Sequence, residues 1–189
     1  MNEPVFIAGT GIISAIGNNV AECLDALENG RAGMGEMHQL DSVHRERLPV
    51  AEVKLSNGEL AKMAGLSKTK SRTALLSMIA AKEALDHAAI PDISSLRCGF
   101  ISANSVGGMD KTENFFTDFL PDNNKGRLRN VVDHECGSVT ELVTDALGIK
   151  DYISTIAPEK ENIVKLHKSQ VPIFEHFGIE KQIKSSFGK

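Results

Sequence analysis

Three short apolar runs alternate along the chain with longer segments in which apolar residues recur at helical spacing. The apolar runs, residues 5–8, 98–103 and 152–156, each have the composition of a buried strand. Strands that alternate with helices are typical of a largely parallel sheet with helices on its faces. The order of elements therefore predicts an α/β fold. The helices are predicted at residues 20–29, 59–63, 68–90, 112–119 and 139–147.

Polar side chains and glycines mark where these helices begin and end. Asn18 or Asn19 caps the first helix, and Gly30 ends it. Ser67 is the predicted cap of the longest helix and Ser138 that of the last one. The region between the first and second predicted helices is polar and irregular, which indicates a surface excursion.

Composition places the chain among ordinary globular proteins, with 41% hydrophobic and 24% charged residues. The apolar runs are far too short to cross a bilayer. Asn2-Glu3-Pro4 leads straight into the first run, without the pattern of a signal peptide. The three cysteines are odd in number and far apart, as in proteins of a reducing compartment. We therefore expect a cytoplasmic protein with no membrane segment.

The net charge of −4 is unevenly distributed. Residues 157–189 carry six lysines and four glutamates, whereas the remaining residues carry 15 basic and 21 acidic side chains. Glutamates interrupt the lysines of 157–189, so we expect no nucleic-acid surface there. The change of sign near residue 156 is a first indication of a boundary.

Two short motifs have a functional and a structural interpretation. Gly9-Thr10-Gly11 matches the start of a dinucleotide-binding fingerprint, but no helix is predicted directly after it, so a tight turn is preferred. Asp133-His134-Glu135-Cys136 holds four potential metal ligands, and Cys136 is alternatively a thiolate activated by a helix N-terminus. Because the sequence nominates no further ligand, we expect a structural cysteine under a helix cap, with no metal and no cofactor.

Five segments, in their order and spacing, resemble the β-ketoacyl-[acyl-carrier-protein] synthases, which have the thiolase fold. Together the segments extend over nearly all of residues 1–156. The resemblance implies an incomplete thiolase-like half with a mostly parallel sheet, flanking helices and one poorly covered sheet face. The segments are residues 5–17, 30–33, 72–85, 99–109 and 145–155.

The same resemblance implies that the catalytic groups of the family are absent from this chain. In the family, the strand equivalent to residues 152–156 runs directly into a nucleophilic cysteine at a helix N-terminus. That cysteine accepts an acyl chain from a carrier-protein thioester, and two histidines far downstream assist decarboxylation of a malonyl thioester. Here Ile156 is followed by Ala157-Pro158-Glu159, and Cys136 precedes the strand. We therefore expect no catalytic residue.

One part of the acyl-binding site is expected to persist. The resemblance implies that Val106 lines an acyl pocket and that Gly107 and Gly108 allow close approach. A plain strand-to-helix turn is the alternative interpretation of these three residues.

The resemblance also implies a function and its partners. The function is that of the N-terminal part of a 3-oxoacyl-[acyl-carrier-protein] synthase, inactive alone. Acyl carrier protein is the expected partner, together with a homodimer mate or a synthase subunit. A non-catalytic subunit like the chain-length factors is the alternative.

Residues 162–188 resemble a stretch of the ribonuclease E/G family that precedes its metal-binding carboxylates, which are not present here. This interpretation divides the chain into a domain at 1–156 and a foreign tail at 157–189. The two would join near Ser154-Thr155-Ile156, as in a recombined or misassembled reading frame. A ribonuclease-related fragment is therefore a third alternative for the function.

Overall fold

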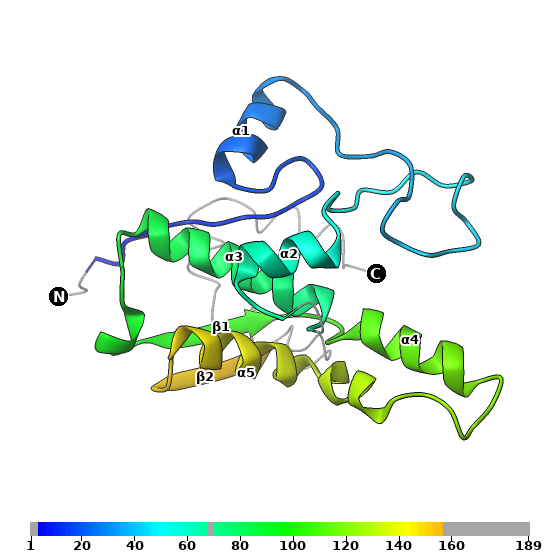
Figure 1. Ribbon diagram of the computed structural model, residues 1–189. Helices are drawn as coiled ribbons and strands as arrows, with labels where there is room; N and C mark the ends of the chain where they lie inside the picture. Colours follow the sequence, from blue (N-terminus) through cyan, green and yellow to red (C-terminus); the bar gives the residue numbers. More distant parts are fainter. Residues whose placement is uncertain (1–3, 68–69, 157–189) are drawn as a thin grey trace, which may run out of the picture.

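The computed structural model describes residues 4–67 and 70–156, and within these ranges the fold is mixed α/β. This confirms the fold class predicted from the order of elements. Figure 1 shows the helices stacked above and beside a small sheet. The elements are α1 (Val20–Glu28), α2 (Asn57–Ala64), α3 (Arg72–His87), β1 (Gly99–Ala103), α4 (Met109–Phe119), α5 (Cys136–Leu147) and β2 (Tyr152–Ile156), with 3-10 turns η1 (Ile93–Ser95), η2 (Leu128–Asn130) and η3 (Val132–His134).

The two strands pair in parallel. Gly99 lies opposite Tyr152 and Ala103 lies opposite Ile156, so both strands end at the same edge of the sheet. A parallel pair needs a long crossover, which the segment containing α4 and α5 supplies. The register therefore brings the residues that follow β1 beside the end of β2.

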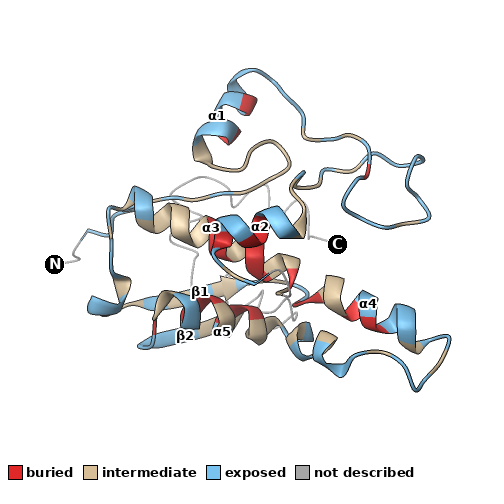
Figure 2. Ribbon diagram, viewed as in Figure 1, coloured by how far each residue is buried: buried red, intermediate tan, exposed pale blue. Residues whose placement is uncertain are grey.

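The hydrophobic core lies where α3 packs between α2 and α5. Leu60 of α2, Leu75 of α3 and Val143 of α5 are fully buried in one cluster. Figure 2 shows the buried residues gathered on the facing sides of these helices. Full burial of a leucine side chain stabilises a fold by about 1.5–3 kcal/mol, so this contact dominates the packing of the described residues.

Residues 5–8 do not form the strand that their apolar run predicts. Val5 is 97% exposed and Ile7 is 87% exposed, and within the described ranges β1 pairs with β2 alone. A strand is stable only when a neighbour accepts and donates its backbone hydrogen bonds, and here no such neighbour is placed. The prediction of a buried strand at 5–8 is therefore wrong for this structure.

The segment that follows is held against α3 instead. The backbone N–H of Ile12 donates to Glu83 Oε2 at 2.8 Å, and that of Val20 donates to Glu83 Oε1 at 2.7 Å. A Cβ at Gly9 would lie 2.1 Å from the carbonyl oxygen of Ala84 on α3. The tight turn predicted at Gly9 is thus a place of close contact with a helix backbone.

Two helix starts differ from the predicted ones. Helix α3 begins at Arg72, where Ser71 accepts a hydrogen bond from the N–H of Ala74, rather than after Ser67. Helix α5 begins at Cys136 without a side-chain cap, rather than after Ser138. Ser67 and Ser71 both precede α3, and tertiary contacts select Ser71, whereas Ser138 lies inside α5.

The apolar surface left open predicts self-association. Besides residues 5–7, Ile101 on β1 is 62% exposed, so one side of the sheet is poorly covered, as expected. A few hundred Å² of exposed apolar surface corresponds to several kcal/mol at about 25 cal/mol per Å². We expect the purified chain to elute as oligomers or aggregates in size-exclusion chromatography, and Ile7→Thr with Ile101→Thr to shift it towards monomer. A sharp monomer peak for the unsubstituted chain would contradict this expectation.

The loop between α1 and α2 is organised by one carboxylate. Glu52 accepts hydrogen bonds from the backbone N–H groups of His38 at 2.5 Å, Gln39 at 3.0 Å and Leu40 at 3.2 Å. Desolvation raises the pKa of the Glu52 carboxyl, but these three donors together with Lys54 outweigh it, and the net pKa is lowered. The charged form of Glu52 therefore stabilises this loop.

This arrangement predicts an acid-dependent contribution to stability. Because the pKa of Glu52 is lower in the folded state, its contribution is present at neutral pH and is lost as the pH falls from about 5 towards 3. We expect Glu52→Gln to lower the free energy of unfolding at neutral pH by less than about 1 kcal/mol, and the difference from the parent to vanish in acid. Urea titrations at both pH values measure it, with Glu28→Gln as the control. A difference independent of pH would contradict this role.

Candidate functional site

The carboxyl ends of the two strands define the candidate site. In open α/β sheets, ligands bind beyond the carboxyl ends of the strands. Here Ala103 and Ile156 end their strands side by side. The turn that contains Val106, Gly107 and Gly108 leads from β1 directly into α4. The structure thus places the predicted binding residues at the edge where a ligand of this fold class is expected.

The two glycines of this turn are buried, and Val106 is 46% exposed. A Cβ at Gly107 would lie 2.4 Å from the carbonyl oxygen of His134 and 2.5 Å from that of Glu135. The N–H of Gly108 donates to the carbonyl of Asp133 at 2.5 Å. Both glycines are therefore required by close backbone contact with η3 and the residue after it. This packing role is separate from the acyl-pocket role that the sequence resemblance implies.

Asn104 is a residue of this edge that the sequence reasoning missed. Its Nδ2 donates to the carbonyl oxygen of Cys136 at 3.2 Å and lies 3.5 Å from Ser102 Oγ. Its Oδ1 is buried without a hydrogen-bond partner among the described residues. A buried unpaired acceptor is costly, so Oδ1 is a candidate acceptor for a ligand. The signal in the sequence was an asparagine placed directly after a predicted strand.

The segment 133–136 is engaged in structural contacts. His134 Nδ1 lies 3.1 Å from Thr112 Oγ1, and that hydroxyl donates to the carbonyl of Gly108 at 3.2 Å. Within residues 4–67 and 70–156, no three side chains of His, Cys, Asp or Glu gather as metal ligands. Cys136 is half-buried at the first position of α5, and its carbonyl is bound by Asn104.

The dinucleotide interpretation of residues 9–14 is disfavoured by the structure. A dinucleotide-binding turn opens the N-terminus of a helix onto the pyrophosphate. Here α1 begins only at Val20, and a Cβ at Gly11 would lie 2.1 Å from the carbonyl of Ala80 on α3. Helix α3 therefore occupies the space that a pyrophosphate would need.

The strand end is also fixed by a pair of hydroxyl groups. Thr155 Oγ1 on β2 lies 2.5 Å from Thr140 Oγ1 on α5, and Thr140 is fully buried. Helix α5 thereby holds the last residues of β2 against its own buried face.

In the part of the chain that is described, no helix is both long and apolar enough to cross a membrane.

Comparison with known proteins shows the fold. The described architecture is similar to that of the ishigamide ketosynthase/chain length factor, with a TM-score of 0.66 and 18% sequence identity. The similarity covers 80% of this chain and 39% of that one. The shared fold is a partial thiolase-like α/β fold, which confirms the fold implied by the sequence resemblance.

No family model matches the chain. Among curated proteins it is similar to ribonuclease E of Haemophilus influenzae, with 34% identity over 64 residues. That match covers 32% of this chain and 7% of ribonuclease E. The chain thus spans less than half of the ketosynthase/chain length factor and a small fraction of the ribonuclease.

The close contact at Gly107 predicts a specific loss of stability. Gly107→Ala forces a Cβ against two carbonyl oxygens, and we expect a destabilisation of about 1–3 kcal/mol. Gly137→Ala is the matched control, because a Cβ at Gly137 in α5 meets nothing within 4 Å and alanine is the better helix former by about 1 kcal/mol. Urea unfolding measures both variants. Equal stability of the two would show that the turn does not pack as described.

Proposed function

We propose that residues 1–156 are the N-terminal part of a 3-oxoacyl-[acyl-carrier-protein] synthase and that this chain is inactive in condensation on its own. The observation that carries the proposal is the fold similarity to a ketosynthase/chain length factor over 80% of the chain. The resemblance of residues 99–109 and 145–155 to the synthases supports it independently.

The expected lack of condensation activity follows from the residues that come directly after β2 in the sequence. Condensation through a covalent intermediate needs a nucleophile to accept the acyl group. Ile156 is followed by Ala157-Pro158-Glu159, whose side chains supply no thiol or hydroxyl. The position implied by the resemblance therefore cannot carry the acyl chain.

The three cysteines differ in their access to the strand ends. Cys23 is buried on α1 with its Sγ 3.3 Å from Ser14 Oγ, and Cys98 precedes β1 at the opposite end of that strand. Cys136 is joined to the candidate site through Asn104. It begins α5, before β2 rather than after it. Cys136 is therefore the residue on which a test for a substitute nucleophile should focus.

The binding role of the turn is part of the same proposal. Val106 would contact the acyl chain, and Gly107 and Gly108 would let it approach the backbone. The half-exposed side chain of Val106 at the strand edge supports this role. Acyl carrier protein would deliver the chain, and a homodimer mate or a synthase subunit would complete the fold.

The proposal predicts the outcome of a condensation assay. With acyl- and malonyl-carrier protein as substrates, we expect no 3-oxoacyl product and no acyl adduct by intact-protein mass spectrometry, because the nucleophile is missing. A complete synthase assayed in parallel is the positive control. Turnover together with an acyl adduct that disappears in Cys136→Ser would overturn the proposal of inactivity.

A non-catalytic partner subunit is the second candidate. One solved structure with a similar fold is a ketosynthase/chain length factor, which favours this candidate. Co-purification of the chain with a complete synthase, and a change in product length on its addition, would distinguish a partner subunit from an inactive fragment.

The similarity to ribonuclease E favours a third candidate, a ribonuclease-related fragment. Residues 162–188, where the sequence resembles the ribonuclease E/G family, lie outside the described residues, and the 64-residue match is longer than that stretch. An RNA-cleavage assay with Mg²⁺ tests this candidate. Sequencing genomic DNA across codons 154–156 tests whether two genes are joined there.

A further inference from the structure

Two asparagine–glycine pairs occur in the sequence, Asn29-Gly30 and Asn57-Gly58. An asparagine followed by glycine is open to a reaction with its own backbone, because glycine has no side chain that shields its amide nitrogen. The two pairs share this local chemistry but lie in different surroundings. The structure therefore decides which of them reacts in the folded chain.

The pair Asn29-Gly30 lies at the C-terminal end of α1, and both of its residues are exposed. Gly30 has a φ of 62°, and a Cβ placed on it would meet nothing within 4 Å. Its N–H donates to the carbonyl of Leu27 at 3.2 Å. A backbone rotation that brings this amide nitrogen to the Asn29 side chain therefore displaces no packed atom, and it breaks hydrogen bonds of the exposed helix end alone.

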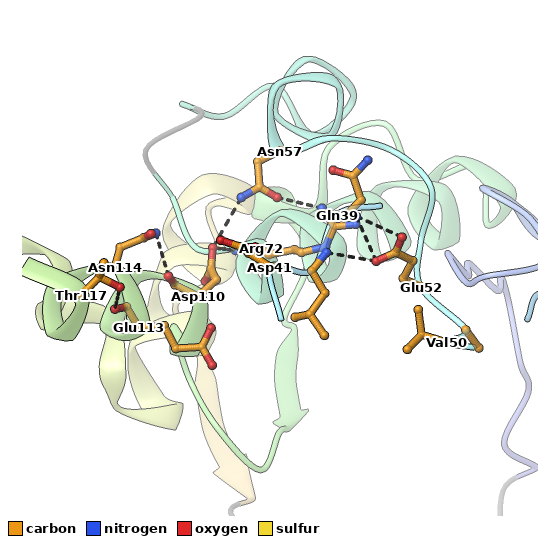
Figure 3. A pocket seen from close by; sticks show the side chains of 12 residues that line it. Gln39, Asp41, Val50, Glu52, Asn57, Arg72, Asp110, Glu113, Asn114 and Thr117 are labelled. Carbon is orange, nitrogen blue, oxygen red and sulfur yellow. Dashed lines mark hydrogen bonds between the residues drawn. The ribbon is translucent and has the colours of Figure 1, made fainter. Parts of the chain in front are cut away.

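The pair Asn57-Gly58 begins α2, and its asparagine is held from two sides. Asn57 Oδ1 accepts from the Arg72 guanidinium at 2.8 Å, and Asn57 Nδ2 lies 3.5 Å from Asp110 Oδ2. Figure 3 shows the Asn57 side chain joined to both of these residues. The same rotation at Asn57 would break a charge-assisted hydrogen bond and disrupt the first turn of α2, close to the core residue Leu60.

The Asn29 side chain also closes the last turn of α1. Its Nδ2 donates to the carbonyl oxygen of Asp25 and to Asp25 Oδ1, both at 2.8 Å, and the second Asp25 carboxylate oxygen pairs with Arg31. Helix α1 has nine residues and buries Cys23 and Ala26, so one turn is a large part of it. A change at Asn29 from an amide to an acid would replace a donor by an acceptor that faces two other acceptors.

We propose that Asn29 is a site of spontaneous deamidation in the folded chain and that the reaction loosens α1. The amide nitrogen of Gly30 bonds to Cγ of Asn29 and gives up its proton, and the side-chain nitrogen leaves as ammonia. The five-membered succinimide then takes up water at one of its two carbonyls and opens to aspartate or isoaspartate. Either product places a carboxylate beside Asp25, near the negative end of the α1 dipole. The site is independent of the synthase proposal, since it uses none of the strand-end residues.

Peptide mapping by mass spectrometry of the full chain, incubated at mildly alkaline pH, measures deamidation at both pairs. We expect Asn29 to deamidate roughly tenfold faster than Asn57 or more, because Asn57 must first lose its bond to the Arg72 guanidinium. In urea, where that bond is absent, the two rates should become similar, since each asparagine is followed by glycine. Asn29→Gln should remove the faster reaction, because its longer side chain closes a less favourable ring. Equal rates in the folded chain, or a difference that persists in urea, would overturn the assignment of the site.

The consequence for α1 is tested with Asn29→Asp, which introduces the acid directly. Cys23 is buried on α1, so its alkylation by iodoacetamide, located by peptide mapping, measures local opening. We expect Cys23 to be alkylated about three- to tenfold faster in Asn29→Asp than in the parent, with the rate at Cys98 unchanged. Asn123→Asp is the matched control, because it adds the same charge at an exposed position outside α1. Equal Cys23 rates in Asn29→Asp and the parent, or the same acceleration in Asn123→Asp, would overturn the loosening of α1.

Discussion

The packing of α3 between α2 and α5 is the contact on which the rest of the described structure depends. Leu75 carries the apolar side of this contact and is completely buried against both neighbours. The polar side of α3 is used as well, since Glu83 accepts two backbone N–H groups from the segment before α1 and from its first residue. One helix thus organises both the core and the N-terminal segment.

The N-terminus of α3 connects that core to the strand-end turn and to the first turn of α4. Thr73 donates to the carbonyl of Gly107 at 3.2 Å, and the N–H of Arg72 donates to Asp110. The strand-end turn and the start of α4 are therefore both held by the first residues of α3. At the strand ends, this support presents the glycine backbone and a half-exposed valine.

Close backbone contacts explain why glycines occupy positions 9, 11, 107 and 108. Gly9 and Gly11 lie against carbonyl groups of α3, and Gly107 and Gly108 lie against the segment around η3. In each case a Cβ would overlap backbone, which cannot move aside as a side chain can. These glycines are requirements of the fold, whatever ligand the strand ends bind.

Within residues 4–67 and 70–156, the sequence alone determined the fold class, the existence of the five α-helices and the two strands, and the location of the turn at Val106. These features depend on local periodicity and on residues next to each other in the chain, which is why they could be predicted. The helix starts at Arg72 and Cys136 could not, because Ser67 and Ser71 compete before α3 and α5 begins without a side-chain cap.

Only the tertiary structure decided the state of residues 5–8, whose apolar pattern is that of a strand but whose hydrogen bonds depend on a neighbour distant in sequence. It also decided that Asp110, an ordinary first-turn acid of α4, accepts a hydrogen bond from the backbone N–H of Arg72 at the start of α3. Periodicity records which face of an element is apolar. Periodicity does not determine which distant backbone group a given side chain contacts. The candidate site is built from such contacts between residues that are far apart in the sequence.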